Sequence, residues 1–229
     1  MDTPNINLSS LKKQAFARFI IINLIIALVL CLSAWNLKYW EAWAFIIVLG
    51  IPMFIFGVYI FKHDPAFLER RMRTKETRKG QKLIIKLSIL PYLLVFIIPG
   101  FDKRLGWSEM PLAVKIIGLI CLLFSYLMIL KVFLTNSYAG RVVEVVEGQK
   151  VISTGPYKLV RHPMYLATIL LYLFAPLALG SYWAMIPTVL FLFIFVPRIK
   201  DEEKELLQNL EGYTEYVKKT KYRLLPFIW

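Results

Sequence analysis

The composition of the chain argues against a soluble protein. Its 229 residues are 58% hydrophobic and only 19% charged, with a mean hydropathy of +0.59, whereas soluble domains are about half apolar and a quarter charged. Two cysteines and many aromatic residues exclude a disulfide scaffold and a disordered chain. The formal net charge of +13 would indicate a nucleic-acid partner only if it formed a basic face on a soluble fold.

Windows without charged residues predict two membrane-spanning helices near the start of the chain. Residues 19–37 and 42–61 contain no Asp, Glu, Lys or Arg. Each window is close to the roughly 20 residues that a helix needs to cross the hydrocarbon core. We expect these helices at about 16–35 and 42–61.

Two further apolar stretches follow, at 83–99 and 112–134. The charged residues within them are Lys86, Lys115 and Lys131, which lie near the ends, where a lysine side chain can reach the interface. Both stretches are predicted to span the membrane.

A longer uncharged segment predicts a helical hairpin. The 36 residues from His162 to Pro197 lack Asp, Glu, Lys and Arg and are interrupted by Gly180-Ser181. The segment is too long for one crossing, so we expect either a tight hairpin at about 163–197 or one long crossing followed by a partial one. The predicted fold is an all-α integral membrane protein with about six transmembrane helices and a cytoplasmic C-terminal helix.

The distribution of Lys and Arg predicts the orientation. If the N-terminus is inside, 24 of these residues fall in inner segments and 4 in outer loops, as the positive-inside rule requires. We therefore expect a multi-pass protein of a prokaryotic cell membrane, with both termini cytoplasmic and an uncleaved first helix. Membrane lipids are the expected partners, and the charge no longer indicates nucleic acid.

We divide the chain into an N-terminal transmembrane region, 1–130, and a C-terminal region, 131–229, whose cytoplasmic tail is 198–229. Polar chemistry should lie in the inner segments. The basic loop 62–82 is expected to contact anionic lipid head groups or to gate a substrate.

The next inner segment contains the start of a helix. Gly155-Pro156 indicates a turn, and Pro163 favours the first turn of a helix. The N–H groups there, together with Arg161 and His162, would attract an anion. Alternatively, the segment only anchors a transmembrane helix at the head groups.

The last inner segment carries a charged helix. Arg198 and Glu202 are four residues apart, so they share a face and can pair or act together. Glu203, Lys204 and Glu205 are expected on a solvated face.

These segments resemble the isoprenylcysteine carboxyl methyltransferase family and, more loosely, the phospholipid methyltransferases. The resemblance covers roughly residues 131–229. It rests on two motifs in order with a hairpin between them: Gly155-Pro156-Tyr157-x-x-Val160-Arg161-His162-Pro163-x-Tyr165, then Arg198-x-x-x-Glu202-Glu203-x-x-Leu206 with Gly212-Tyr213-x-x-Tyr216.

The resemblance implies an S-adenosylmethionine site and a lipidic, isoprenoid-type or lipidated acceptor, with no metal. Arg198 and Glu202 would be catalytic, Arg198 facing the substrate and Glu202 the cofactor. The other implied cofactor-binding residues are Gln149, Lys150, Val151, Ile152, Tyr157 as an aromatic wall, Arg161, His162, Pro163, Met164 and Tyr165.

Methyl transfer from a sulfonium is an in-line displacement, so the protein must chiefly align the reacting groups. A carboxylate acceptor, ionised at neutral pH, would be oriented by Arg198. An amine acceptor must be neutral, and Glu202 or Glu203 would then take its proton.

Two other functions stay open on the sequence alone. Membrane reductases of the sterol reductase type are similar in the same region and bind NADPH there. A transporter or another non-enzymatic membrane protein is the second alternative, although the predicted spans have no ionisable residue near their centres.

Overall fold

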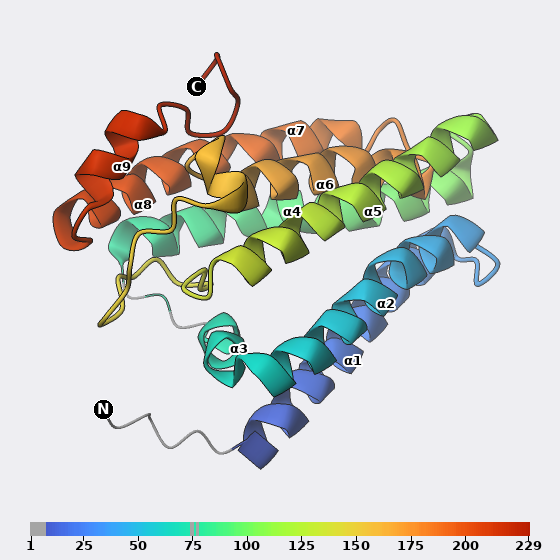
Figure 1. Cartoon of the computed structure of the whole chain (residues 1–229). Helices are drawn as coiled ribbons and strands as arrows, with labels where there is room; N and C mark the ends of the chain where they lie inside the picture. The colour runs from blue at the N-terminus through green and yellow to red at the C-terminus, as the bar shows by residue number, and fades with distance from the viewer. Residues whose placement is uncertain (1–7, 74–75, 77) are drawn as a thin grey trace.

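The computed structural model describes residues 8–73, 76 and 78–229. These residues form helices joined by turns and loops, and they contain no strand (Figure 1). Residues 1–7, which are predicted to lie on the inner side, and Lys75 of the basic loop are outside the described residues. Within this described part of the chain, four helices are long and apolar enough to cross a membrane, as predicted. They are α1 (Leu8–Ala34), α2 (Trp40–His63), α4 (Lys79–Leu105) and α5 (Leu112–Thr135).

The remaining helices are shorter. Gly180, in the left-handed region with φ +79°, ends α6, which confirms the break predicted there. The hairpin arms are too short to be assigned as crossings by length alone, so the count of six stays a prediction. The short elements are α3 (Pro65–Met72), a 3₁₀ turn η1 (Gly155–Lys158), α6 (Pro163–Leu179), α7 (Met185–Phe193), α8 (Phe195–Asn209) and α9 (Tyr213–Lys219).

The structure gathers the basic inner segments at one end of the bundle. Figure 1 shows α3, the loop after α5, α8 and α9 together at the end opposite the turns after α1, α4 and α6. This grouping follows from the up-and-down order of the long helices. It places the two motifs of the C-terminal region side by side.

The opposite end is held by a buried polar cluster that joins α2 to α4 and α5. Glu41 is fully buried, and its Oε1 accepts from Lys103 Nζ at 3.1 Å and from Lys115 Nζ at 2.7 Å. Beside it, the hydroxyl of Tyr39 donates to the carbonyl of Leu179 at 2.6 Å. Because buried charges are costly unless paired, this cluster fixes the α1–α2 hairpin to the rest of the bundle.

The helices α5 and α6 cross at a glycine. A Cβ added at Gly118 would lie 2.6 Å from the backbone nitrogen of Ala178 and 2.8 Å from the carbonyl carbon of Leu177. Small residues allow this kind of close backbone approach between membrane helices. The crossing holds the last turn of α6, at the end of the helix opposite Pro163, against α5.

We expect Gly118→Ala to lower the melting temperature in detergent by several degrees, since overpacking costs about 1–3 kcal/mol. The matched control is Gly57→Ala on α2, where an added Cβ meets nothing within 4 Å. Equal melting temperatures for the two variants would contradict the close crossing.

Candidate active site

A pocket opens at the end of the bundle where the basic segments gather. Its walls come from the loop after α5, the segment before η1, the first turn of α6, and α8 and α9. All twelve site residues predicted from the sequence line this pocket: Gln149, Lys150, Val151, Ile152, Tyr157, Arg161, His162, Pro163, Met164, Tyr165, Arg198 and Glu202.

One wall of the pocket is apolar and aromatic. Tyr157, Tyr213 and Tyr216 form a buried cluster with Val132 and Leu210. The cluster is pinned by hydrogen bonds: the Tyr157 hydroxyl accepts from the side-chain amide of Asn136 at 2.8 Å, and the Tyr216 hydroxyl donates to the Tyr157 carbonyl at 2.7 Å. Burial raises the pKa of the Tyr157 hydroxyl, so this wall is neutral at physiological pH.

The hydroxyl of Tyr213 is an exception in this wall. It is buried and has no hydrogen-bond partner among the described residues. A buried hydroxyl without a partner carries a desolvation cost, which a polar ligand in the pocket would remove.

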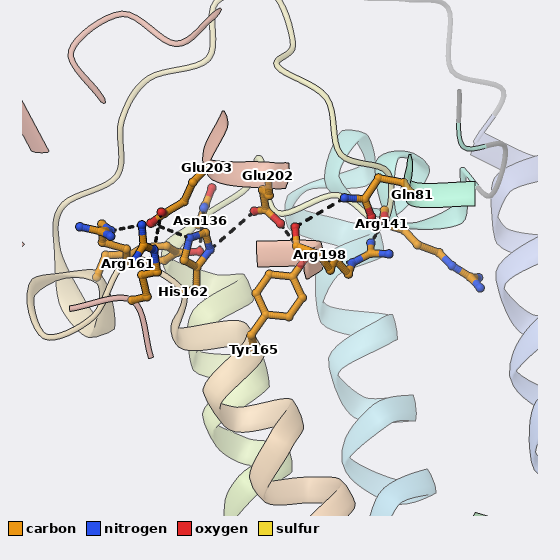
Figure 2. A network of polar contacts seen from close by, with 11 residues as sticks. Gln81, Asn136, Arg141, Arg161, His162, Tyr165, Arg198, Glu202 and Glu203 are labelled. Atoms are coloured by element: carbon orange, nitrogen blue, oxygen red, sulfur yellow. Dashed lines mark hydrogen bonds and ion pairs between the residues drawn. The ribbon is translucent and has the colours of Figure 1, made fainter. Parts of the chain in front are cut away.

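Arg198 and Glu202 meet through a third side chain, Tyr165. The Tyr165 hydroxyl donates to Glu202 Oε2 at 2.6 Å and accepts from Arg198 Nε at 3.0 Å (Figure 2). The predicted shared face is therefore confirmed, but the two residues are bridged by a hydroxyl that α6 supplies. Arg198 Nη2 also donates to the carbonyl of Arg141 at 3.0 Å, which fixes the plane of its guanidinium.

Glu203 does not lie on a solvated face, and that prediction is wrong. It is 4% exposed; one carboxylate oxygen accepts from Arg161 Nε at 2.6 Å and the other from Arg223 Nε at 2.6 Å. His162 Nε2 lies 3.3 Å from the first oxygen. Burial acts to raise the pKa of Glu203, but His162, Arg223 and Arg161 outweigh it and lower the pKa to about 2.

The C-terminal tail takes up donors that were expected to face a ligand. The backbone N–H groups of Arg161 and His162 donate to the carbonyls of Tyr222 and Arg223, both at 2.9 Å. The Arg161 guanidinium is committed to Glu203. The chain itself therefore satisfies these backbone N–H groups and the Arg161 guanidinium, while the prediction that the start of α6 binds an anion stays a prediction.

Helix α4 holds α8 in place. Arg78 pairs with Glu205 and, at 2.7 Å, with Asp201, while the Gln81 side-chain amide donates to Asp201 at 2.6 Å. Glu205 is thus paired, not simply solvated as expected. These contacts orient the helix that carries Arg198 and Glu202.

Sequence reasoning missed part of the lining. The loop after α5 supplies a whole wall, and its polarity after a predicted span was the only local signal. Tyr213 and Tyr216 are part of the second motif, but no function was predicted for them. The additional lining residues are Asn136, Tyr138, Ala139, Gly140, Arg141, Val142, Val143, Glu144, Glu205, Leu206, Leu210, Tyr213 and Tyr216.

Four apolar helices with a polar, aromatic-walled pocket at one end describe a membrane protein with an enzyme-like site. Residues 114–213 match the family model of phospholipid methyltransferase, the family of membrane methyltransferases like isoprenylcysteine carboxyl methyltransferase. The resemblance predicted from the sequence is confirmed, and the family indicates a membrane methyltransferase. The match covers less than half of the chain and leaves out α1 to α4. No curated protein matches the chain.

Methyltransferases of this kind normally use S-adenosylmethionine, and the residues present suit that molecule. Its purine is apolar on its faces and matches the tyrosine wall. Its amino and hydroxyl groups are hydrogen-bond donors, for which Glu202 and the unpartnered Tyr213 hydroxyl offer oxygens. The pocket chemistry is therefore compatible with this cofactor.

Tyr213→Phe is the sharpest test of that fit. We expect several-fold weaker binding of S-adenosylmethionine, because one hydrogen bond contributes about 1 kcal/mol, and an unchanged or higher melting temperature of the cofactor-free protein. Tyr216→Phe is the control, since its hydroxyl donates within the protein; it should lower stability and leave cofactor affinity nearly unchanged. Titration calorimetry and thermal unfolding separate the two. Unaltered affinity in Tyr213→Phe would exclude a contact between this hydroxyl and the cofactor.

Proposed function

We propose that the protein is an S-adenosylmethionine-dependent methyltransferase that acts on a lipidic, isoprenoid-type or lipidated acceptor at the cytoplasmic face of a cell membrane, with a carboxylate as the methylated group. The supporting observation is the bridge from Arg198 through Tyr165 to Glu202, which lines a pocket shared by both motifs. The family match favours this function over a reductase or a transporter.

The bound cofactor supplies an electrophilic methyl group on a sulfonium. An acceptor carboxylate oxygen would form the new C–O bond while the S–CH₃ bond breaks, and the electron pair of the broken bond would stay on sulfur. The protein's contribution is alignment. Arg198 presents a planar guanidinium, which suits a carboxylate, and its orientation is set by Tyr165 and the Arg141 carbonyl.

A general base is not required for this acceptor, because a carboxylate is ionised at neutral pH. Glu203 is unsuited to such a role, since both of its oxygens accept from arginines and its pKa lies at about 2. Glu202 is the carboxylate of the pair that lines the pocket. We assign to it the cofactor-binding role.

The decisive experiment supplies the purified protein in nanodiscs with S-adenosylmethionine labelled in the methyl group and with a total membrane lipid extract. We expect a labelled lipid that releases labelled methanol in alkali, as a methyl ester does. An alkali-stable product would replace the carboxylate by a nitrogen or sulfur acceptor. Absence of both product and cofactor binding, together with binding of NADPH, would support the reductase alternative.

The proposed orientation places the pocket and both termini in the cytoplasm of a prokaryotic cell. We expect Lys150→Cys, in a background with Cys31→Ala and Cys121→Ala, to react with an impermeant maleimide only after the cells are permeabilised. Lys38→Cys, at the opposite end, should react in intact cells. Both side chains are exposed. The reverse pattern would invert the topology.

A further inference from the structure

Helix α3 reaches the edge of the pocket although it lies outside the segment that the family model matches. Arg71 on this helix donates from Nη1 to the carbonyl of Gly140 at 3.0 Å, and its guanidinium lies 4.5 Å from the centre of the Phe133 ring. Arg198 donates to the carbonyl of the next residue, Arg141, at 3.0 Å. Two guanidinium groups therefore bind consecutive carbonyls of one loop.

The side chain of Arg141 adds a third positive charge there. Arg141 and Arg198 both line the pocket, and the side chain of Arg141 is exposed. Burial, followed by the charges of Arg141 and Arg198, lowers the pKa of Arg71 to about 10. Arg71 is still cationic at neutral pH, so three positive charges gather at this edge of the pocket.

The charge of this group is not balanced by salt bridges. Within the described part of the chain, neither Arg71 nor Arg141 has a carboxylate within ion-pair distance, whereas Arg70 lies 3.9 Å from Asp64 and Arg78 pairs with two acids. Glu202 and Glu76 offset part of the charge of Arg198, since against the effect of burial they help to raise its pKa, although Glu76 also accepts from backbone N–H groups and Glu202 from Tyr165. Arg71 and Arg198 are partly buried and donate to uncharged oxygens, so much of their positive charge stays available to an oxyanion.

We propose that Arg71, Arg141 and Arg198 bind the acidic head group of the methyl acceptor, an oxyanion carried by a lipid tail. The inference rests on the proposed function and deepens it, since it makes the acceptor an acidic lipid and makes α3 part of the acceptor site. Guanidinium groups bind carboxylate and phosphate through paired charged hydrogen bonds. Methylation of a carboxylate removes its charge, so the ester product is held less tightly than the acid.

The test measures equilibrium binding of radiolabelled dodecanoate to the full-length protein in phosphatidylcholine nanodiscs, without cofactor and with empty nanodiscs subtracted. We expect Arg71→Gln and Arg141→Gln each to weaken binding about tenfold, the effect of one charged hydrogen bond, and Arg71→Lys to restore part of it. Dodecyl phosphate in place of dodecanoate distinguishes a phosphate from a carboxylate preference. Methyl dodecanoate should bind weakly to every variant.

Arg70→Gln is the matched control. Arg70 also binds a carbonyl of this loop, that of Ser137, through Nη2 at 2.7 Å. Like Arg71 it is not a lining residue of the pocket, but unlike Arg71 it has a carboxylate, that of Asp64, at 3.9 Å. Its dodecanoate affinity should stay within about twofold of that of the unaltered protein. Equal losses of dodecanoate affinity in Arg70→Gln and Arg71→Gln would mean that Arg71 only holds the loop in place. Unchanged affinity in Arg71→Gln and Arg141→Gln would overturn the proposal.

The exposed Arg141 keeps the test valid if Arg71→Gln does not fold. Because dodecanoate binding is measured without turnover, its outcome does not depend on whether the protein is a methyltransferase. If no acceptor is methylated but dodecanoate binding depends on these arginines, the acidic-lipid site stands and the methyltransferase proposal falls.

Discussion

Glu203→Ala is expected to destabilise the pocket end of the protein by about 3–5 kcal/mol, since removing one partner of a buried ion pair leaves the other charge uncompensated. Arg161 would lose its carboxylate while only 7% exposed, and Arg223 and His162 would lose the same partner. Thermal unfolding in detergent measures the loss. Glu203→Gln should be less stable than the unaltered protein but more stable than Glu203→Ala, because it keeps the shape of the side chain and some of the hydrogen bonds.

The control for this variant is Glu215→Ala on α9, whose carboxylate pairs with Lys218 while both side chains are 66% exposed. Exposed pairs contribute little, so its melting temperature should be close to that of the unaltered protein. A Glu203→Ala protein as stable as Glu215→Ala would show that the buried cluster does not hold the tail.

The same cluster predicts how stability depends on pH. The pKa of Glu203 is lowered from 4.5 to about 2 in the folded protein. A group with a lowered folded pKa contributes stability that is present above its unfolded pKa and is lost as the pH falls through the folded pKa. The contribution of Glu203 should therefore be complete above about pH 4.5 and should fade toward pH 2. Glu203→Gln should remove this part of the acid dependence.

Arg198→Lys is expected to lower turnover about 100-fold, the effect that misplacing a reacting group by about 1 Å can have, with S-adenosylmethionine affinity nearly preserved. The guanidinium bonds Tyr165 and the Arg141 carbonyl in one plane, both at 3.0 Å. A lysine keeps the charge but not this planar fork. Steady-state kinetics and cofactor titration measure the two effects.

Lys200→Ala controls for loss of a nearby charge, because Lys200 is exposed on the same helix and outside this pocket; its turnover should be unchanged. A purely structural role for Arg198 predicts another pattern. Arg198→Ala and Glu202→Ala would then lower the melting temperature alike, and the double variant would be no worse than either single variant. Normal turnover in Arg198→Ala would end its catalytic assignment.

The sequence predicted the long helices and most of the pocket because both are encoded locally. Uncharged windows mark the spans, and the two motifs, together with the segment 149–152 just before the first one, carry the twelve predicted lining residues. The start of α1 and both ends of α4 lie outside the predicted windows, since hydropathy marks the part in hydrocarbon while helical hydrogen bonding continues beyond it.

Contacts between distant segments could not be predicted in this way. Arg78 is more than 120 residues from its partners on α8. The sequence of a basic loop does not indicate which acidic residues will pair with it. Glu203 shows the opposite case. It is four residues after Ile199, and both are buried, so the spacing that places residues on one helical face was a local signal that the run of charges concealed.

The buried cluster around Glu41 has a mechanical consequence for the hairpin of α1 and α2. That cluster ties the hairpin down at the end remote from the pocket. At the pocket end the contacts are arginine side chains on carbonyl oxygens of the loop after α5 and the rings of Phe56 and Phe67 against Phe133 of α5. Helix α2 has 24 residues, about 36 Å of length at 1.5 Å per residue. A tilt of about 5° around the tied end displaces the other end by about 3 Å. Any such tilt would therefore have its largest displacement beside the pocket, where it would have to disturb the packing of Phe56 and Phe67 on Phe133.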